Sequence, residues 1–266
     1  MMKTVFSGLR LYAHYVSINI RSAMQYKSSL LLTIMGQLLV SFSMFFGIHF
    51  MFMRFHSVKG YTYEEVLVCF AIVLLQFSLA EMFARGFDMF AGIVRRGEFD
   101  RVLLRPRSLI LQVLGAKFEI TRIGRMAQAV VIFLWVMGRG TIRWTGGRIA
   151  ALLLMLAGGA LLFAALFLIY AAFCFYTLEG LEFMNVFTDG GREYGKYPID
   201  VYGKRLTQFS TFIIPYAMVQ YYPLQYLLGR SENTLLALCP LGALVFLLAA
   251  YGFWRVGLRR YTSTGS

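Results

Sequence analysis

Long apolar runs separated by short polar segments dominate this chain. The runs cover about 30–53, 65–80, 117–137, 149–175, 206–228 and 235–254, and most approach the roughly 20 residues that a helix needs to cross a bilayer. In a membrane, backbone polar groups must be paired within the segment, which favours helices. The pattern therefore predicts an all-α, polytopic membrane protein with six transmembrane helices.

The chain ahead of the first run is amphipathic. Val5, Leu9, Tyr12 and Val16 recur at helical spacing, with basic residues distributed around them. This spacing predicts an interfacial helix on the membrane surface, and an N-terminal extension of the first span is an equally good interpretation. The domain prediction is one transmembrane domain, 1–266, with an amphipathic segment at 1–29, six spans within 30–256 and a cytosolic tail at 257–266.

A basic, mostly polar island at 92–108 separates the second run from the third. Pro106 disfavours helix at Arg105, so a short helix is expected from about Arg95 to Arg105. On a helical wheel, its charged face holds Glu98, Arg101 and Arg105, and its apolar face holds Phe99, Val102 and Leu103. Such a helix either lies on the membrane surface or docks into another protein.

Composition and charge agree with a membrane protein. The chain is 59% hydrophobic and 15% charged, against about 45–50% and about 25% in soluble domains. The net charge of +13 is interpreted as basic residues retained on the cytosolic side, facing anionic lipid. Lys and Arg concentrate near both termini, in 92–108 and in 176–205, so all four regions are predicted to be cytosolic.

Ionisable residues inside the second and third runs form one candidate site. An intramembrane charge is a functional candidate by default. Mutual neutralisation at helical spacing is the alternative, which we favour. The charge set comprises Glu81, Arg85, Asp88, Glu119 and Arg122. Glu119, Arg122 and Arg125 are expected to pair either among themselves or with the second span.

The fifth run is unusually polar and aromatic, and Pro215 and Pro223 interrupt it. It either lines a translocation path or forms an aromatic belt at the membrane interface. The translocation-path candidates are Tyr216, Gln220, Tyr221, Tyr222 and Gln225.

Catalytic and metal-ligating patterns are absent from the sequence. The histidines and cysteines show no metal-ligand spacing, and no serine- or cysteine-based catalytic set is recognisable. We therefore expect no catalytic residue, no metal and no enzymatic activity in this chain.

Three segments resemble the membrane subunit of a bacterial type-2 ATP-binding-cassette exporter, from the branch whose permeases are paired beside one ATPase. The first segment, 96–106, is similar to the family pattern G-E-[L/F]-D-x-x-L-L-x-P. The second is Tyr197 to Tyr202, followed by Ile214-Pro215 and Tyr222-Pro223, and the third is the tail from Phe253 to Tyr261.

The resemblance implies a non-enzymatic permease that pairs with an identical or homologous permease over a cytosolic ATPase dimer. ATP and magnesium would be bound by the ATPase, and this chain would bind no cofactor. It implies a multi-pass protein of the bacterial plasma membrane that exports an amphiphilic, drug-like, peptide or lipid substrate. An ATP-independent channel or secondary transporter is the alternative, with the intramembrane charge set as its transport site.

The resemblance also implies that the loop between spans two and three forms a coupling helix seated on the ATPase, and that the N-terminal segment is an elbow helix. Which face of the coupling helix docks stays open. The coupling residues are Arg96, Gly97, Glu98, Phe99, Asp100, Arg101, Val102, Leu103, Leu104, Arg105 and Pro106.

Overall fold

The computed structural model describes residues 2–140, 142–177 and 182–262, and the regular structure in these ranges is helical. Five stretches are long and apolar enough to cross a membrane. They are α2 (Lys27–Arg54), α3 and α4 together (Tyr63–Arg95), a 3-10 turn with α7 (Ile120–Gly138), α8 (Gly146–Thr177), and α13 to α14 (Leu235–Arg259). The all-helical prediction is confirmed. The six-span prediction is not, because the described residues contain five such stretches.

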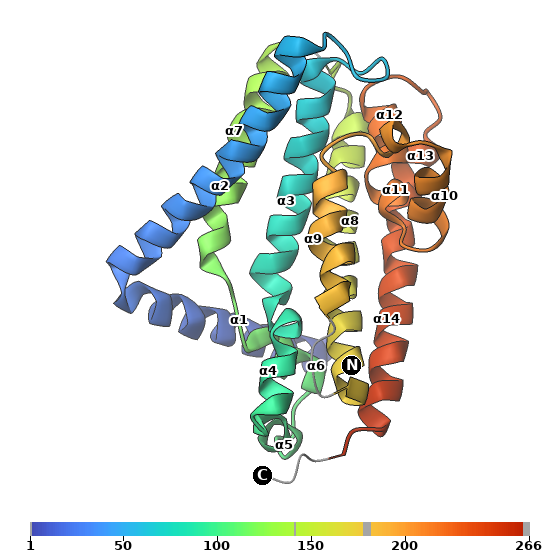
Figure 1. The fold of residues 1–266 in the computed structure, drawn as a ribbon. Helices are drawn as coiled ribbons and strands as arrows, with labels where there is room; N and C mark the ends of the chain where they lie inside the picture. The colour runs from blue at the N-terminus through green and yellow to red at the C-terminus, as the bar shows by residue number, and fades with distance from the viewer. Residues whose placement is uncertain (1, 141, 178–181, 263–266) are drawn as a thin grey trace.

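The helix α3 (Tyr63–Asp88) lies in the centre of the bundle, between α7 on one side and α8 on the other (Figure 1). A capping box starts it: the Thr62 hydroxyl accepts from the Glu65 backbone N–H at 3.3 Å, and the Glu65 carboxylate accepts from the Thr62 N–H at 2.9 Å. In the apolar stretch that α3 forms with α4, 83% of the residues are buried, whereas in α2 only 11% are. The core is therefore built around α3, and α2 is left mostly exposed.

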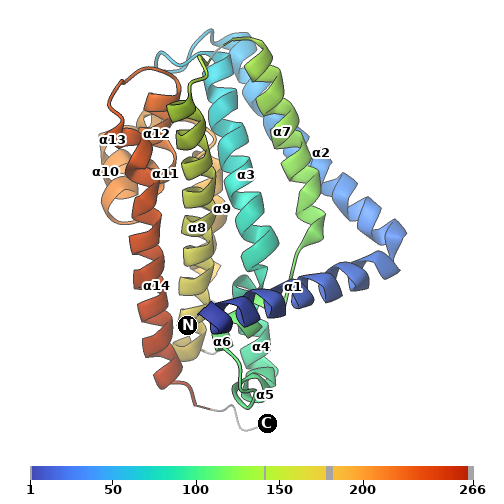
Figure 2. The same ribbon diagram turned by 180° about the vertical axis from the view of Figure 1, so that it is seen from behind.

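The helix α1 (Met2–Gln25) crosses the other helices instead of continuing α2 (Figures 1 and 2). The chain bends at Tyr26, whose φ of −114° and ψ of 64° are not helical. Of the two interpretations of residues 1–29, the extension of the first span is therefore wrong. The transverse placement is the geometry that an interfacial helix requires.

Three short helices follow α3 at the end of the bundle that we call the α5 end. They are α4 (Phe90–Arg95), α5 (Glu98–Leu103) and α6 (Leu109–Gly115). Gly97 adopts a φ of +66°, which an L side chain rarely takes, and this left-handed turn separates α4 from α5. The expected helix from Arg95 to Arg105 is thus shorter than predicted and is displaced from α4 by that turn.

Short elements fill the interval between α8 and α14. They are a 3-10 turn (Glu182–Met184), α9 (Asn185–Tyr194), a 3-10 turn (Ile199–Tyr202), α10 (Lys204–Phe212), α11 (Tyr216–Val219), α12 (Tyr221–Leu227), α13 (Leu235–Leu238) and a 3-10 turn (Cys239–Leu241). The predicted fifth span, 206–228, is therefore three short helices and not one spanning helix. The chain turns at Ile213 to Pro215 and at Gln220, where the backbone departs from α-helical geometry.

The sequence also misplaced the basic region at 176–205. The helix α9 rises along α3 and α8, so the residues after it lie at the end opposite α5 (Figure 1). Lys59 donates to the Asp200 backbone oxygen at 2.7 Å, and Lys204 lines the same cavity as Lys59. Asp200 and Lys204 are therefore on the side predicted to be far from the termini, because α9 carries the chain across the bundle.

Candidate functional site

The segment α5 is attached to the bundle by aromatic rings. Phe99 is fully buried, and its ring centroid lies 5.0 Å from that of Phe90 and 5.6 Å from that of Phe175. Trp254 lies 4.8 Å from Phe175. We call this group, completed by Tyr261, the Phe99 cluster: Phe90, Phe99, Phe175, Trp254 and Tyr261. It joins α5 to α4, to the end of α8 and to the end of α14.

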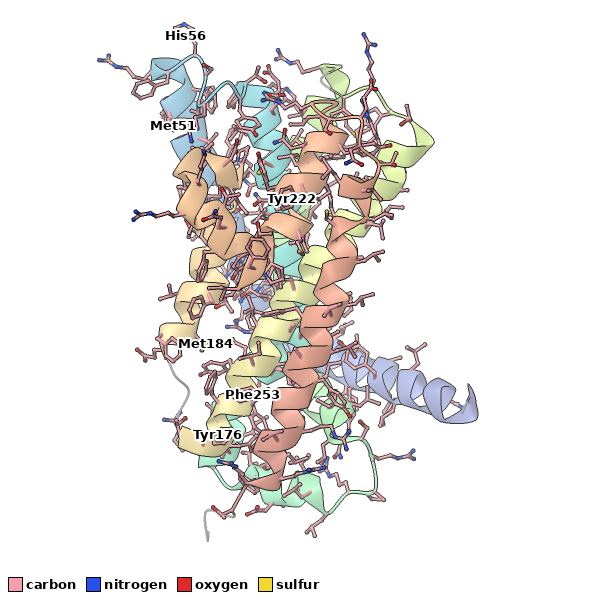
Figure 3. All side chains as sticks on the ribbon, turned by 90° about the vertical axis from the view of Figure 1, so that its right-hand side faces the viewer. Met51, His56, Tyr176, Met184, Tyr222 and Phe253 are labelled. Carbon is pink, nitrogen blue, oxygen red and sulfur yellow. The ribbon has the colours of Figure 1, made fainter. Side chains whose placement is uncertain are left out.

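Further rings extend this contact along the neighbouring helices. Figure 3 shows Tyr176 and Phe253 close together near the α5 end, remote from His56 at the opposite end. Their rings are stacked, with centroids 5.9 Å apart. Since aromatic pairs are dense and prefer defined geometries, α8 and α14 are held as one unit next to α5.

The chain returning from α5 is pinned by a glutamine. Gln112 is buried, and its side-chain Nε2 donates to the backbone oxygen of Arg107 at 3.1 Å and of Val102 at 3.4 Å. The Val102 carbonyl also accepts from the Arg105 backbone N–H at 3.3 Å, so Gln112 adds a second donor there and ties the end of α5 to Arg107. The loop from α5 to α6 is therefore a built structure that holds α5 from its C-terminal side.

The tail contacts α5 directly. The Tyr261 hydroxyl donates to Asp100 Oδ1 at 3.0 Å, and its ring lies 5.0 Å from Phe99. Burial, and then the Asp100 carboxylate, raise the pKa of Tyr261 to about 12, so the hydroxyl remains a donor at neutral pH. Two of the three segments that carry the family resemblance thus meet in space, although the sequence placed them about 160 residues apart.

The outer side of α5 is charged and partly apolar. Leu104 is 85% exposed and Leu103 is 40% exposed, whereas Phe99 is buried. The predicted apolar face therefore does not act as one surface: Phe99 packs inside the bundle and cannot contact a partner, whereas Leu103 faces outward. Arg101 and Arg105 are exposed beside the two leucines.

Glu98 is engaged within its own segment. Its carboxylate accepts from Arg96 Nε at 2.7 Å. That hydrogen bond lowers the pKa of Glu98, and it contributes little stability because both groups face solvent. The residues that remain open to a partner lie in α5 and directly after it. They are Arg101, Leu103, Leu104 and Arg105.

The buried charge set closes around Glu81, as the neutralisation hypothesis predicts. The Glu81 carboxylate is 3% exposed as a residue and lies 3.0 Å from Arg122 and 2.9 Å from Arg125. Arg85 lies 3.2 Å from Glu81 and 2.7 Å from Asp88. These ion pairs join α3 to the start of α7.

Glu119 stands apart from that set. Its carboxylate accepts from the Thr121 hydroxyl at 2.8 Å and lies 3.8 Å from Lys117. Its backbone N–H donates to the Met82 oxygen at 3.1 Å, which fixes the chain entering α7 against α3. Glu119 therefore helps to position α7, and its charge acts on buried Arg122 more weakly than that of Glu81.

The five translocation-path candidates do not form one site: two are buried, two line a cavity, and Gln225 binds another loop. Tyr216 and Gln220 are buried, and Gln220 Nε2 donates to Cys69 Sγ at 2.8 Å, so both hold the short helices against α3 and α9. Tyr221 and Tyr222 instead line a cavity of about 460 Å³ at the end opposite α5 (Figure 3 labels Tyr222). Gln225 donates to the Tyr61 hydroxyl at 2.6 Å.

Tyr61 and Arg230, which organise the end of the bundle opposite α5, were missed by the sequence analysis. The Tyr61 hydroxyl donates to Asp200 Oδ2 at 3.1 Å. Arg230 binds Glu65 at 2.6 Å and stacks over the Tyr61 ring at 4.1 Å. We call this set, completed by Gln225, the Asp200 network: Tyr61, Glu65, Asp200, Gln225 and Arg230. Contacts between residues this distant in sequence leave no local signal.

No group of three or more metal-ligating His, Cys, Asp or Glu side chains is present in the described part of the chain. What the described residues do define is a helical membrane protein with one protruding, charged segment rigidly attached to its bundle.

Comparison with known sequences gives the family. The family model described as ABC-2 family transporter protein matches residues 38–265, which is most of the chain. This chain therefore belongs to the ABC-2 family of transporter proteins, as its motifs indicated. No curated protein and no solved structure matches it.

Proposed function

We propose that this chain is the permease subunit of an ATP-driven exporter. It pairs with a second permease, identical or homologous, over two cytosolic ATPase subunits that bind ATP and magnesium. The chain itself carries no catalytic residue and binds no cofactor. The family assignment supports a transporter component, and the single observation that carries the ATP coupling is the attachment of α5 to the Phe99 cluster.

The mechanism follows from that attachment. When the ATPase dimer closes on ATP, it displaces α5, which is seated on it through Leu103, Leu104, Arg101 and Arg105. Because Phe99 is fully buried among rings from α4, α8 and α14, the displacement is passed to three helices together. Rearrangement of these helices in both permeases then alternates access to the path for an amphiphilic, drug-like, peptide or lipid substrate.

Orientation is part of the proposal. The α5 end, with both termini, faces the cytosol of a bacterial cell, and α1 lies along the inner leaflet of its plasma membrane. The basic residues of 92–108 support this orientation, since Lys and Arg are retained on the cytosolic side. Lys196, Lys204 and Arg205 lie toward the opposite end, which weakens the charge bias but leaves the excess of basic residues at the α5 end.

The test is co-purification with the ATPase encoded beside this chain. Replacing Arg101 by Ala, or Leu104 by Asp, removes an exposed group of α5 without touching the Phe99 cluster. We expect each change to weaken assembly and substrate-stimulated ATP hydrolysis about tenfold, the size of a moderate interface anchor. Arg54→Ala, an exposed arginine at the opposite end, is the matched control.

Membrane insertion and yield should be unchanged in all three variants. Normal assembly and stimulation in both α5 variants would contradict the proposed docking surface. Transport that persists without any ATPase would contradict the exporter itself.

A further inference from the structure

A basic cavity lies between α1 and the chain that leaves α5. Its volume is about 580 Å³. Its lining residues are Arg10, Leu11, Ala13, His14, Ser17 and Arg107. The cavity thus joins the transverse N-terminal helix to the loop that follows the proposed docking segment.

Both walls of this cavity are fixed by contacts. On α1, the Tyr12 hydroxyl donates to the Phe83 oxygen at 2.9 Å, and Asn19 Nδ2 donates to the Gly115 oxygen at 3.3 Å. A Cβ at Gly115 would lie 2.6 Å from the Tyr15 ring, so α1 and α6 approach as closely as glycine permits. On the other wall, Gln112 holds the Arg107 backbone oxygen. The two backbone segments that carry the lining residues are therefore held in place by the fold.

The chemistry of the cavity is cationic and hydrogen-bonding. Two guanidinium groups, an imidazole and a hydroxyl line it, and no carboxylate does. Among the described residues, neither Arg10 nor Arg107 forms an ion pair. Guanidinium groups donate in a planar fork that matches phosphate oxygens. Two uncompensated arginines facing one cavity are suited to a phosphate group.

The place of the cavity on α1 distinguishes a membrane phosphate from a dissolved one. Arg10, His14 and Ser17 are spaced four and three apart, so they share one side of the helix. Leu9, 69% exposed, projects from the adjacent side of the same turn. A helix that lies crosswise at the ends of the spans holds such an apolar side at the headgroup boundary. The basic side is then at the depth of lipid phosphates.

We propose that this cavity binds the phosphate of an anionic membrane lipid, held between Arg10 and Arg107 with His14 and Ser17 as further contacts. The bound lipid bridges α1 to the loop after α5 and stabilises the position of that loop. This site requires only that α1 lies on a membrane, so it does not depend on ATP coupling.

The experiment uses the full chain in nanodiscs of phosphatidylcholine, with and without phosphatidylglycerol. Thermal unfolding and the number of phosphatidylglycerol molecules retained in native mass spectrometry are measured for each. We expect phosphatidylglycerol to raise the melting temperature of the wild type. Arg10→Gln and Arg107→Gln should each weaken lipid retention about fivefold, the effect of one basic residue near an anionic surface.

Controls separate this site from general charge. Arg54→Gln removes the same charge from an exposed position at the opposite end and should leave retention unchanged. Equal loss in Arg54→Gln, or no loss in either cavity variant, would overturn the proposal. A third arm adds inorganic phosphate to phosphatidylcholine discs, and a shift as large as that from phosphatidylglycerol would assign the site to a soluble anion instead.

The same measurements keep this proposal separate from the proposed function. Lipid retention is recorded without any ATPase, so failure to assemble with an ATPase leaves its result intact. Conversely, Arg101→Ala should impair assembly and leave lipid retention unchanged, because Arg101 does not line the cavity.

Discussion

The two ends of this bundle are held together by different physics. At the α5 end, the Phe99 cluster packs rings from four parts of the chain, and charged side chains project outward. At the opposite end, the Asp200 network joins two loops and the short helices by directional hydrogen bonds and one ion pair. Its polar groups bind one another and do not project toward a partner.

This difference indicates a division of roles. Densely packed rings with defined mutual geometries hold one another in place, so the group can move as a block while its internal contacts persist. Hydrogen bonds to a carboxylate lose most of their strength when the geometry changes. The α5 end is therefore suited to receive and transmit a displacement, and the opposite end is suited to keep the short helices in place.

The largest effect is expected for the buried charge set between these ends. Replacing Glu81 by Ala leaves Arg122 and Arg125 buried without an opposite charge, which typically costs about 3–5 kcal/mol. The measurement is the free energy of unfolding in detergent. Glu119→Ala is the matched control, and its loss should stay below about 1 kcal/mol, since the ion pair that Glu119 forms in the described part of the chain is partly exposed and 3.8 Å long.

An equal cost for the two glutamates would show that the set around Glu81 is hydrated. That result would favour the alternative hypothesis, in which the charge set is the transport site of a channel or secondary transporter.

A smaller effect is expected at the Phe99 cluster. Replacing Phe99 by Ala removes a fully buried ring and should cost about 3 kcal/mol. Leu104 follows α5 directly, and its side chain is 85% exposed. Leu104→Ala should therefore remove an apolar side chain from the same segment with almost no loss of stability. Unfolding measurements on both variants therefore separate packing from docking.

The two variants should diverge in function as well. Phe99→Ala should uncouple ATP hydrolysis from substrate even where assembly survives, because α5 is no longer attached to the three helices. If Phe99→Ala keeps full coupling, displacement reaches the spans by another route.

The smallest effects are expected for one hydroxyl at each end. Tyr61→Phe removes hydrogen bonds with Asp200 and Gln225 and should cost about 1–2 kcal/mol. Tyr261→Phe keeps the ring and removes only the bond to Asp100, at about 1 kcal/mol or less. Hydrogen exchange should show the loss of protection confined to the loop 55–62 in the first variant and to α5 in the second.

The Tyr261 bond also has a defined pH range. Because its pKa is raised to about 12 from 10, its contribution is complete below pH 10 and is lost as the pH rises toward 12. Stability between pH 7 and 9 should therefore be the same in the wild type and in Tyr261→Phe once the constant offset is subtracted. A difference that varies across this range would contradict the assignment of Tyr261 as the donor.

Local spacing predicted the features that depend on one helix at a time. The pairing of the charges on α3 follows from steps of three and four. The pairs of Arg122 and Arg125 with Glu81 are one of the two alternatives that the sequence left open. A short helix ahead of Pro106 was predicted, and α5 is present there, although it ends at Leu103 and not at Arg105. The burial of Phe99 was not predicted. Helical spacing separates the two faces of a helix but does not say which face the rest of the chain covers.

The region after α8 could not be predicted by counting apolar residues. The sequence of α9 contains Asp189, Arg192 and Glu193, so no hydropathy window marks it, although it carries the chain along α3. Its charges are paired within the helix, Arg192 with Asp189 at 3.5 Å and with Glu193 at 3.0 Å. The link from Tyr61 to Asp200 spans 139 residues, and only the folded chain brings them together.

The short helices after α8 have a consequence for biosynthesis. α9, α10, α11 and α12 have 10, 9, 4 and 7 residues, and insertion as an independent span requires about 20. Their backbone ends need partners that lipid does not supply. The helices α9, α11 and α12 contact α8, whereas α11 and α12 also contact α14 and α13, which follow them in the chain. The segment can therefore settle completely only after α13 and α14 have been synthesised, and an order of assembly is encoded in the length of four helices.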